Sequence, residues 1–201
     1  MSAPGLSSRL SLILDRAPED VFEPDSVSDA PMVPFEAYAE DSRVFGWVRL
    51  NADRLTDLLN AYDELHLANV EIESLTGGTT EIATEILVLR DQLIAVHAGH
   101  PRGDENQRRR TRKHPVAVQA RHYLIGGYVH AAPGVDPIAS LRERPPMIPL
   151  TEAWIEYWSG GQRKRQWVGT LVVNRDLTDS IRLVTEDDLS FGRLRYLPPQ
   201  A

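Results

Sequence analysis

The sequence has no cysteine, few aromatic residues and no long apolar run. Without cysteine, the chain has no disulfide, thiolate-bound zinc, iron–sulfur cluster or cysteine nucleophile. Aromatic residues make up 7% of its 201 residues. The short apolar run from Leu10 to Leu14 is too short for a secretory core or a membrane span. We therefore expect a cytoplasmic protein with no membrane partner.

Charge is divided unevenly along the chain. The net charge is −7, yet residues 1–101 hold 6 Arg or Lys against 18 Asp or Glu, whereas residues 102–201 hold 16 against 11. The two parts should therefore attract each other, within one molecule or between molecules.

The hydrophobic pattern predicts a mainly β protein. Val44, Gly46 and Val48 share one face of an expected strand. A short helix with apolar residues at i, i+3 and i+4 is expected from Leu55 to Tyr62. Three further strands then follow, with a bulge near Asn69 and a turn at Gly77-Gly78.

The same pattern returns later in the chain, which indicates an internal duplication. The matches are Gly46-Trp47-Val48 with Gly127-Tyr128-Val129, Leu59 with Leu141, Leu67 with Leu150, Ile72-Glu73 with Ile155-Glu156, Gly77-Gly78 with Gly160-Gly161, Val88 with Val173, Arg90-Asp91 with Arg175-Asp176, and Ile94 with Ile181. Their offset grows along the chain from 81 to 87 residues. We therefore predict two tandem small barrel-like or curved-sheet units, each with one short helix.

This pattern divides the chain into five segments. They are an N-terminal extension with an acidic, proline-rich tether (1–41), a first β unit (42–97), a basic flexible linker (98–118), a second β unit (119–186) and a tail (187–201). The extension carries a possible short helix with an apolar face for docking a partner, formed by Leu6, Leu10, Ile13 and Leu14.

The segments "LTDLLN" and "VLRDQLIAV" resemble the two motifs of Sm-like small β-barrels. In this resemblance, Arg90 matches the arginine of the second motif and Asn60 lies near the first. Asp91 stands where that family has glycine, the helix lies inside the unit, and the second copy has no Asn in place of Asn60. The chain is also similar to uncharacterised bacterial β proteins with an "RLTDLLN" segment. The resemblance implies a small curved sheet or barrel that assembles or binds.

Few residues form a pattern that carries chemistry. The basic residues that could bind a polyanion are Arg108, Arg109, Arg110, Arg112 and Lys113 in the linker and Arg163, Lys164 and Arg165 at a hairpin turn. No aromatic residues interleave with either run along the sequence, and five of the six histidines lie between His97 and His130 without a scaffold for a metal. The repeated Arg-Asp pairs are interpreted as turn residues, with Asp bonded to its own backbone.

We therefore expect no catalytic residues, cofactor or metal. The expected function is a non-enzymatic protein interaction or assembly module that engages a protein partner or further copies of itself through exposed sheet edges and the N-terminal segment. Nucleic-acid or polyanion binding through the linker is the alternative, and a small-molecule or metal-dependent enzyme is the second alternative.

Overall fold

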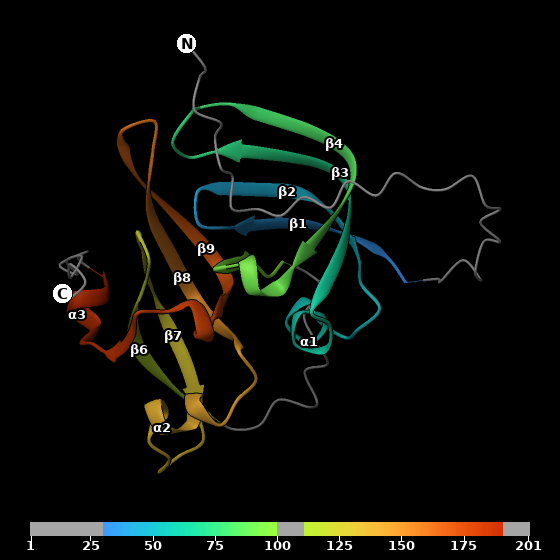
Figure 1. Ribbon diagram of the computed structural model, residues 1–201. Helices are drawn as coiled ribbons and strands as arrows, with labels where there is room; N and C mark the ends of the chain where they lie inside the picture. Colours follow the sequence, from blue (N-terminus) through green and yellow to red (C-terminus); the bar gives the residue numbers. More distant parts are fainter. Residues whose placement is uncertain (1–29, 100–110, 191–201) are drawn as a thin grey trace.

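The structure, a computed structural model, describes residues 30–99 and 111–190. They form one ten-stranded antiparallel sheet that is not closed into a barrel, with short helices beside it (Figure 1). The strand order is β10-β6-β7-β8-β9-β5-β1-β2-β3-β4. The prediction of a mainly β protein with short helices is confirmed at this level.

Residues 30–99, which we call the first half, contain five strands and one helix. In chain order these are β1 (Met32–Tyr38), β2 (Ser42–Arg49), α1 (Leu55–Ala61), β3 (Glu64–Ser74), β4 (Thr80–Leu89), a 3-10 turn η1 (Arg90–Gln92) and β5 (Ala95–His97). The expected helix forms because Leu55, Leu58 and Leu59 recur on one face, and all three are buried.

Residues 111–190, the second half, repeat this order of elements. They are β6 (Arg112–Ala120), β7 (Tyr123–Ala131), α2 (Pro137–Arg142), β8 (Met147–Ser159), β9 (Gln162–Asn174), the 3-10 turn η3 (Arg175–Leu177), β10 (Ser180–Leu183) and a final helix α3 (Glu186–Ser190). α2 begins where Asp136 accepts a hydrogen bond from the Ile138 amide (2.9 Å) and Pro137 occupies the first turn.

Gly46 and Gly127 lie in matching surroundings. Each is at a register shift in its strand, where the facing strand carries one extra residue with positive φ: Asn69 (50°) opposite β2 and Glu152 (50°) opposite β7. A Cβ on Gly46 would lie 3.1 Å from the Ala68 carbonyl oxygen, and one on Gly127 would lie 3.1 Å from the Leu150 Cβ. The bulge expected near Asn69 is confirmed, and it occurs in both halves.

Two strands lie where the sequence analysis placed connecting segments. β1 occupies residues 32–38 of the expected N-terminal extension, and β6 occupies residues 112–118 of the expected linker. Each contains a proline, Pro34 or Pro115, at a position where the short neighbouring strand, β5 or β10, has no register partner. A proline is tolerated there because no neighbouring strand needs its missing N–H. α3 likewise takes up residues 187–190 of the expected tail.

The register also corrects the last repeat match. Val96 pairs with Ala37 in the first half, and Ile181 pairs with Val118 in the second. Ala37 and Val118 occupy equivalent register positions opposite β2 and β7. Val96 is therefore the counterpart of Ile181, and Ile94 is not. The offset between counterparts is therefore 81 for the first two strands, 83 for the third, and 85 for the last two.

Each half has its own cluster of buried apolar residues, and each cluster also contains residues of the other half. The first contains Leu59, Leu67 and Val88 together with Met147 and Val172 of the second half. The second contains Ile125, Leu150 and Ile155 together with Tyr38, Leu75, Ile94 and Ala95 of the first half. The two halves therefore pack on each other through buried side chains.

Candidate functional site

The junction between the halves is a pair of antiparallel strands, β5 and β9. Ala95, Val96 and His97 lie opposite Val173, Val172 and Leu171. Hydrogen bonds from the Ala98 amide to the Thr170 carbonyl and from the Asn174 amide to the Ile94 carbonyl, both 2.9 Å, extend the pairing at each end. The last strand of the first half thus binds the fourth strand of the second half.

Side chains beside this strand pair reinforce the junction. The Asn60 amide group, at the end of α1, donates to the Met147 carbonyl and accepts from the Met147 amide, both at 3.0 Å. Asn174 donates to the Arg90 carbonyl (3.2 Å), and the buried Tyr123 hydroxyl donates to the Ala39 carbonyl (2.6 Å). Every one of these bonds joins one half to the other.

A polar cluster of charged and aromatic side chains lies at the same junction. Arg43 binds Glu36 (2.6 Å) and Glu73 (3.1 Å), and His97 contacts Glu36 through Nδ1 (3.1 Å) and the Tyr38 hydroxyl through Nε2 (3.2 Å). The Tyr38 hydroxyl donates to Gln166 of β9 (3.0 Å).

The cluster has strongly shifted pKa values. Burial alone would raise the pKa of Glu36, but hydrogen bonds and charge from His97, and then from Arg43, outweigh it and lower the pKa to about 2. Burial is the main cause that raises the pKa of Tyr38. Because Tyr38 is fully buried and its pKa is raised, its hydroxyl stays protonated at neutral pH and fits a structural role.

Two strands have a free edge within the described residues, β4 of the first half and β10 of the second. β4 is the counterpart of β9, and β10 is the counterpart of β5. The paired junction strands β9 and β5 are therefore the counterparts of the two strands, β4 and β10, whose edges remain free. Ile82, on β4, is 85% exposed.

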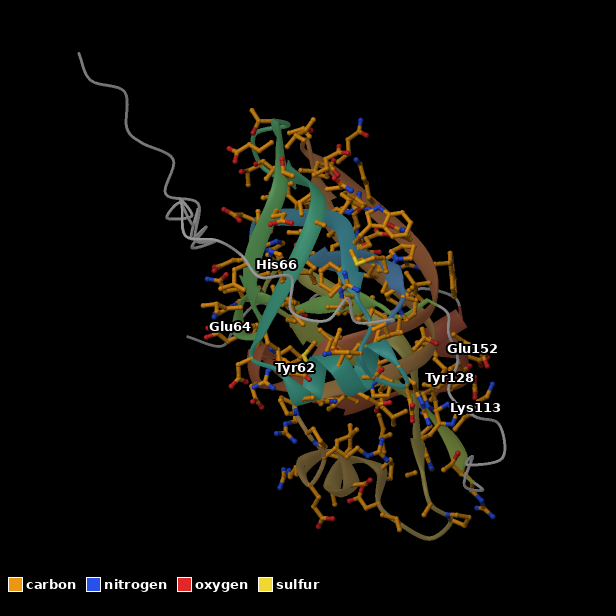
Figure 2. All side chains as sticks on the ribbon, turned by 90° about the vertical axis from the view of Figure 1, so that its right-hand side faces the viewer. Tyr62, Glu64, His66, Lys113, Tyr128 and Glu152 are labelled. Carbon is orange, nitrogen blue, oxygen red and sulfur yellow. The ribbon has the colours of Figure 1, made fainter. Side chains whose placement is uncertain are left out.

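Of the basic residues predicted from the sequence, those that the structure describes lie on β6 and β9, two strands that are not neighbours in the sheet. Arg108, Arg109 and Arg110 lie outside the described residues, as do Leu6, Leu10, Ile13 and Leu14 of the expected docking helix. Lys113 lies on β6, forms an ion pair with Glu152 and stands 5.3 Å from the Tyr128 ring centroid (Figure 2). Arg163 and Arg165 both pair with Glu156 on the neighbouring strand.

The repeated Arg-Asp pairs have a structural role, but it belongs to the arginines. Arg90 forms an ion pair with Asp63 after α1 (2.5 Å). Arg175 donates from Nη1 to three carbonyls at the end of α2, those of Leu141 (2.8 Å), Arg142 (3.0 Å) and Arg144 (2.8 Å). Each arginine therefore ties its 3-10 turn to the end of the preceding helix. In the second turn, Asn174 and not Asp176 accepts the backbone amide hydrogen bond.

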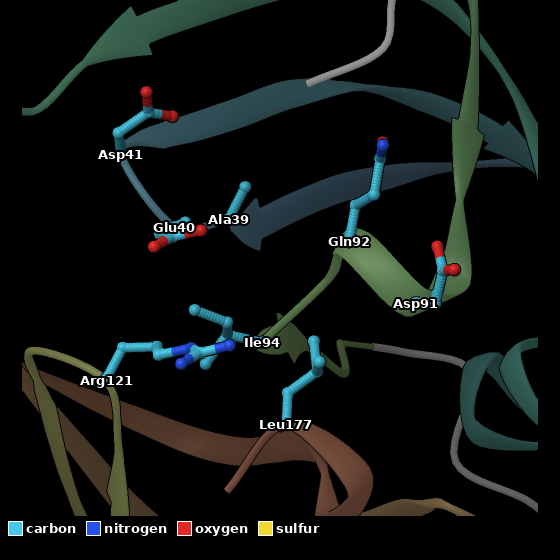
Figure 3. A pocket seen from close by; sticks show the side chains of 8 residues that line it. All are labelled: Ala39, Glu40, Asp41, Asp91, Gln92, Ile94, Arg121 and Leu177. Atoms are coloured by element: carbon cyan, nitrogen blue, oxygen red, sulfur yellow. The ribbon is translucent and has the colours of Figure 1, made fainter. Parts of the chain in front are cut away.

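An open pocket of about 200 Å³ lies between the turns of the two halves (Figure 3). Glu40, Asp41 and Asp91 line it from the first half, and Arg121 and Leu177 line it from the second. Among residues 30–99 and 111–190, no group of three or more His, Asp or Glu side chains is placed to hold a metal. No helix in these ranges is long and apolar enough to cross a membrane.

Comparisons with known proteins give no identity for the chain: no family model, curated protein or solved structure matches it.

Proposed function

We propose that the two halves are copies of one unit, related by internal duplication, and that the chain is a non-enzymatic assembly module. In this proposal, β4 of one molecule pairs with β10 of the next. The observation that carries it is the β5–β9 junction, since the same two kinds of strand edge already bind each other once within the chain. We also propose that each half is a small barrel-like unit of the Sm-like kind. The sheet that the described residues form is open.

The intramolecular junction sets the register of the proposed contact. Residues of β4 and β10 follow from those of β9 and β5 when the offset of 85 is subtracted from the first set of residue numbers and added to the second. Val88, Leu87 and Ile86 then lie opposite Ser180, Ile181 and Arg182 of the next molecule. The bonds at either end become Leu183 amide to Glu85 carbonyl and Leu89 amide to Asp179 carbonyl. Unpaired N–H and C=O groups at a strand edge favour pairing of this kind.

Side chains at the flanks of the contact also correspond. Asn60 and Met147 are hydrogen-bonded to each other within the chain. In the proposed contact, Arg142 of one molecule takes the place of Asn60, and Glu64 of the next molecule takes the place of Met147. Arg142 ends α2 and Glu64 begins β3, and both are exposed (Figure 2 shows Glu64). An arginine and a glutamate at matching positions would replace the neutral amide bonds by an ion pair between molecules.

A charge exchange at these two positions tests the proposal. Glu64→Arg and Arg142→Glu should each weaken self-association about 3- to 10-fold in analytical ultracentrifugation, because each places like charges opposite each other. The double variant should restore association, since the pair is then reversed. Asp57→Arg, an exposed α1 change outside the proposed contact, is the matched control and should leave association unchanged. A wild-type chain that stays monomeric up to about 100 μM, the dissociation constant of a contact worth about 5 to 6 kcal/mol, contradicts the proposal.

A further inference from the structure

One face of the β8–β9 hairpin combines three tryptophans with two arginines and a glutamate. The cross-strand pairs are Trp154 with Trp167, Glu156 with Arg165, and Trp158 with Arg163. Side chains directly opposite each other on paired strands share a face. Along the sequence no aromatic residue stands among these basic residues, because tryptophan and arginine come together on this face only when β8 and β9 pair.

Within this face, the inner residues Trp154 and Glu156 are buried and the outer tryptophans are exposed. Trp154 is fully buried under Arg165, whose guanidinium lies 4.2 Å from the indole centroid. Glu156 is almost buried and binds Arg163 Nε (2.5 Å) and Arg165 Nη2 (2.7 Å). Trp158 and Trp167 remain 56% and 65% exposed. We call Trp158, Arg163, Arg165 and Trp167 the Trp–Arg face.

Such a face has the composition of a binding surface. Exposed tryptophan is costly in water, and tryptophan and arginine dominate the energetics of protein interfaces. Two arginines share the single carboxylate of Glu156, so the face keeps an excess of positive charge. Its ligand should therefore combine carboxylates with at least one apolar side chain or proline.

We infer that the occupant is the chain's own acidic segment, residues 15–29. Of the three segments outside the described ranges, residues 1–29 carry a net charge of −4, whereas residues 100–110 and 191–201 each carry +2. Residues 15–29 contain six Asp or Glu and one Arg, with Phe22 as their single aromatic residue. This is the one segment with both the charge and the apolar group that the face requires.

Charge also selects the second half over the first. The described residues of the first half hold 12 Asp or Glu against 4 Arg or Lys, whereas those of the second half hold 9 against 10. An acidic segment is therefore repelled by the first half and drawn to the second.

The spacing of the two tryptophans suits this segment. Trp158 on β8 lies opposite Arg163 on β9. Since Arg163 is four residues from Trp167 on the same strand, the two tryptophans are roughly 13 Å apart along the strand direction. Pro18 and Phe22 are four residues apart, and they would span about 12 Å in an extended polyproline conformation. Proline-rich peptides commonly bind exposed aromatic side chains in this way.

Photo-crosslinking in the full-length chain tests the docking. With benzoylphenylalanine in place of Phe22, we expect mass spectrometry to locate crosslinks on β8 or β9 near Trp158 and Trp167. The yield should fall at least threefold in Trp158→Ala or Trp167→Ala, and also in 0.5 M salt, because both stacking and charge contribute. Trp47→Ala, an exposed tryptophan of the first half, is the matched control and should leave the yield unchanged. The mass of the product separates docking within one molecule from docking on a neighbour.

Three results would overturn the inference: crosslinks confined to the first half, no crosslinks, or a yield that the Trp158 and Trp167 variants leave unchanged. A labelled 20-nucleotide single strand provides the second arm. If it binds at low salt with loss of affinity in the same two variants while Phe22 forms no crosslink there, the face is a polyanion site and not the dock of residues 15–29.

Discussion

At the scale of single residues, Gly126 is required by the packing of Trp154. A Cβ at Gly126 would lie less than 3.0 Å from three atoms of the buried indole ring. Gly126→Ala should therefore lower the free energy of unfolding by about 1–3 kcal/mol, as other overpacking substitutions do. Gly169→Ala on the neighbouring strand β9 is the matched control, because a methyl group there would meet no atom within 4 Å. Chemical denaturation compares the two, and equal stabilities would contradict this account of Gly126.

Glu36 makes a pH-dependent contribution at the same scale. Its pKa is lowered from 4.5 to about 2 in the folded protein, so ionised Glu36 stabilises the fold above pH 4.5, and this contribution is lost as the pH falls towards 2. Glu36→Gln should lower the unfolding free energy at pH 7 by up to roughly 3 kcal/mol. The difference from the wild type should shrink between pH 4.5 and pH 2. Urea denaturation across this range measures it, and a difference independent of pH would contradict the assignment.

At the scale of elements, the sequence predicted what local periodicity determines. The strand from Arg43, the helix from Leu55 and the bulge near Asn69 follow from spacing and were found as expected. β1 was missed because its proline and acidic surroundings suggested a tether, although Val33, Phe35 and Ala37 alternate as a strand requires. β6 was missed for the similar reason that a basic run leads directly into it.

One signal would have found both missed strands. Pro34 and Pro115 differ by 81 residues, the offset that also relates Gly46 to Gly127. They occupy equivalent places, opposite Trp47 in β2 and Tyr128 in β7. Extending the repeat toward the N-terminus of each half would have placed a strand around each proline.

The Trp–Arg face and the junction could not be predicted from spacing alone. The face depends on the register of β8 and β9, which sets Arg163 opposite Trp158 and Trp167 opposite Trp154. The junction depends on β5, three residues long, finding β9 more than seventy residues later. Contacts of that sequence separation are fixed by tertiary packing, and local preferences do not encode them.

At the scale of the whole molecule, one chain carries two different free edges, so the proposed contact is heterologous. Pairing of β4 with β10 leaves a free edge at each end of every complex. Growth therefore continues until a ring closes or a filament extends. A molecule with one blocked edge can still join a neighbour, but it must end the chain. Blocking the two edges in separate molecules thus distinguishes head-to-tail assembly from any symmetric contact.

Leu87→Pro and Ile181→Pro would provide these two blocked molecules. Their counterparts at the junction are Val172 and Val96. Because hydrogen-bonded residues alternate along a strand, and Thr170 and Asn174 are hydrogen-bonded across the junction, the amides of Val172 and Val96 also face the partner strand. Each proline should therefore remove a hydrogen-bond donor from a free edge. Circular dichroism checks that each variant folds, and Leu87→Val is the control that keeps the amide. Each proline variant alone should be monomeric in sedimentation. An equimolar mixture should form dimers and nothing larger, because one intact β4 then meets one intact β10. Dimers of either variant alone would show that the contact is symmetric and would reject head-to-tail pairing.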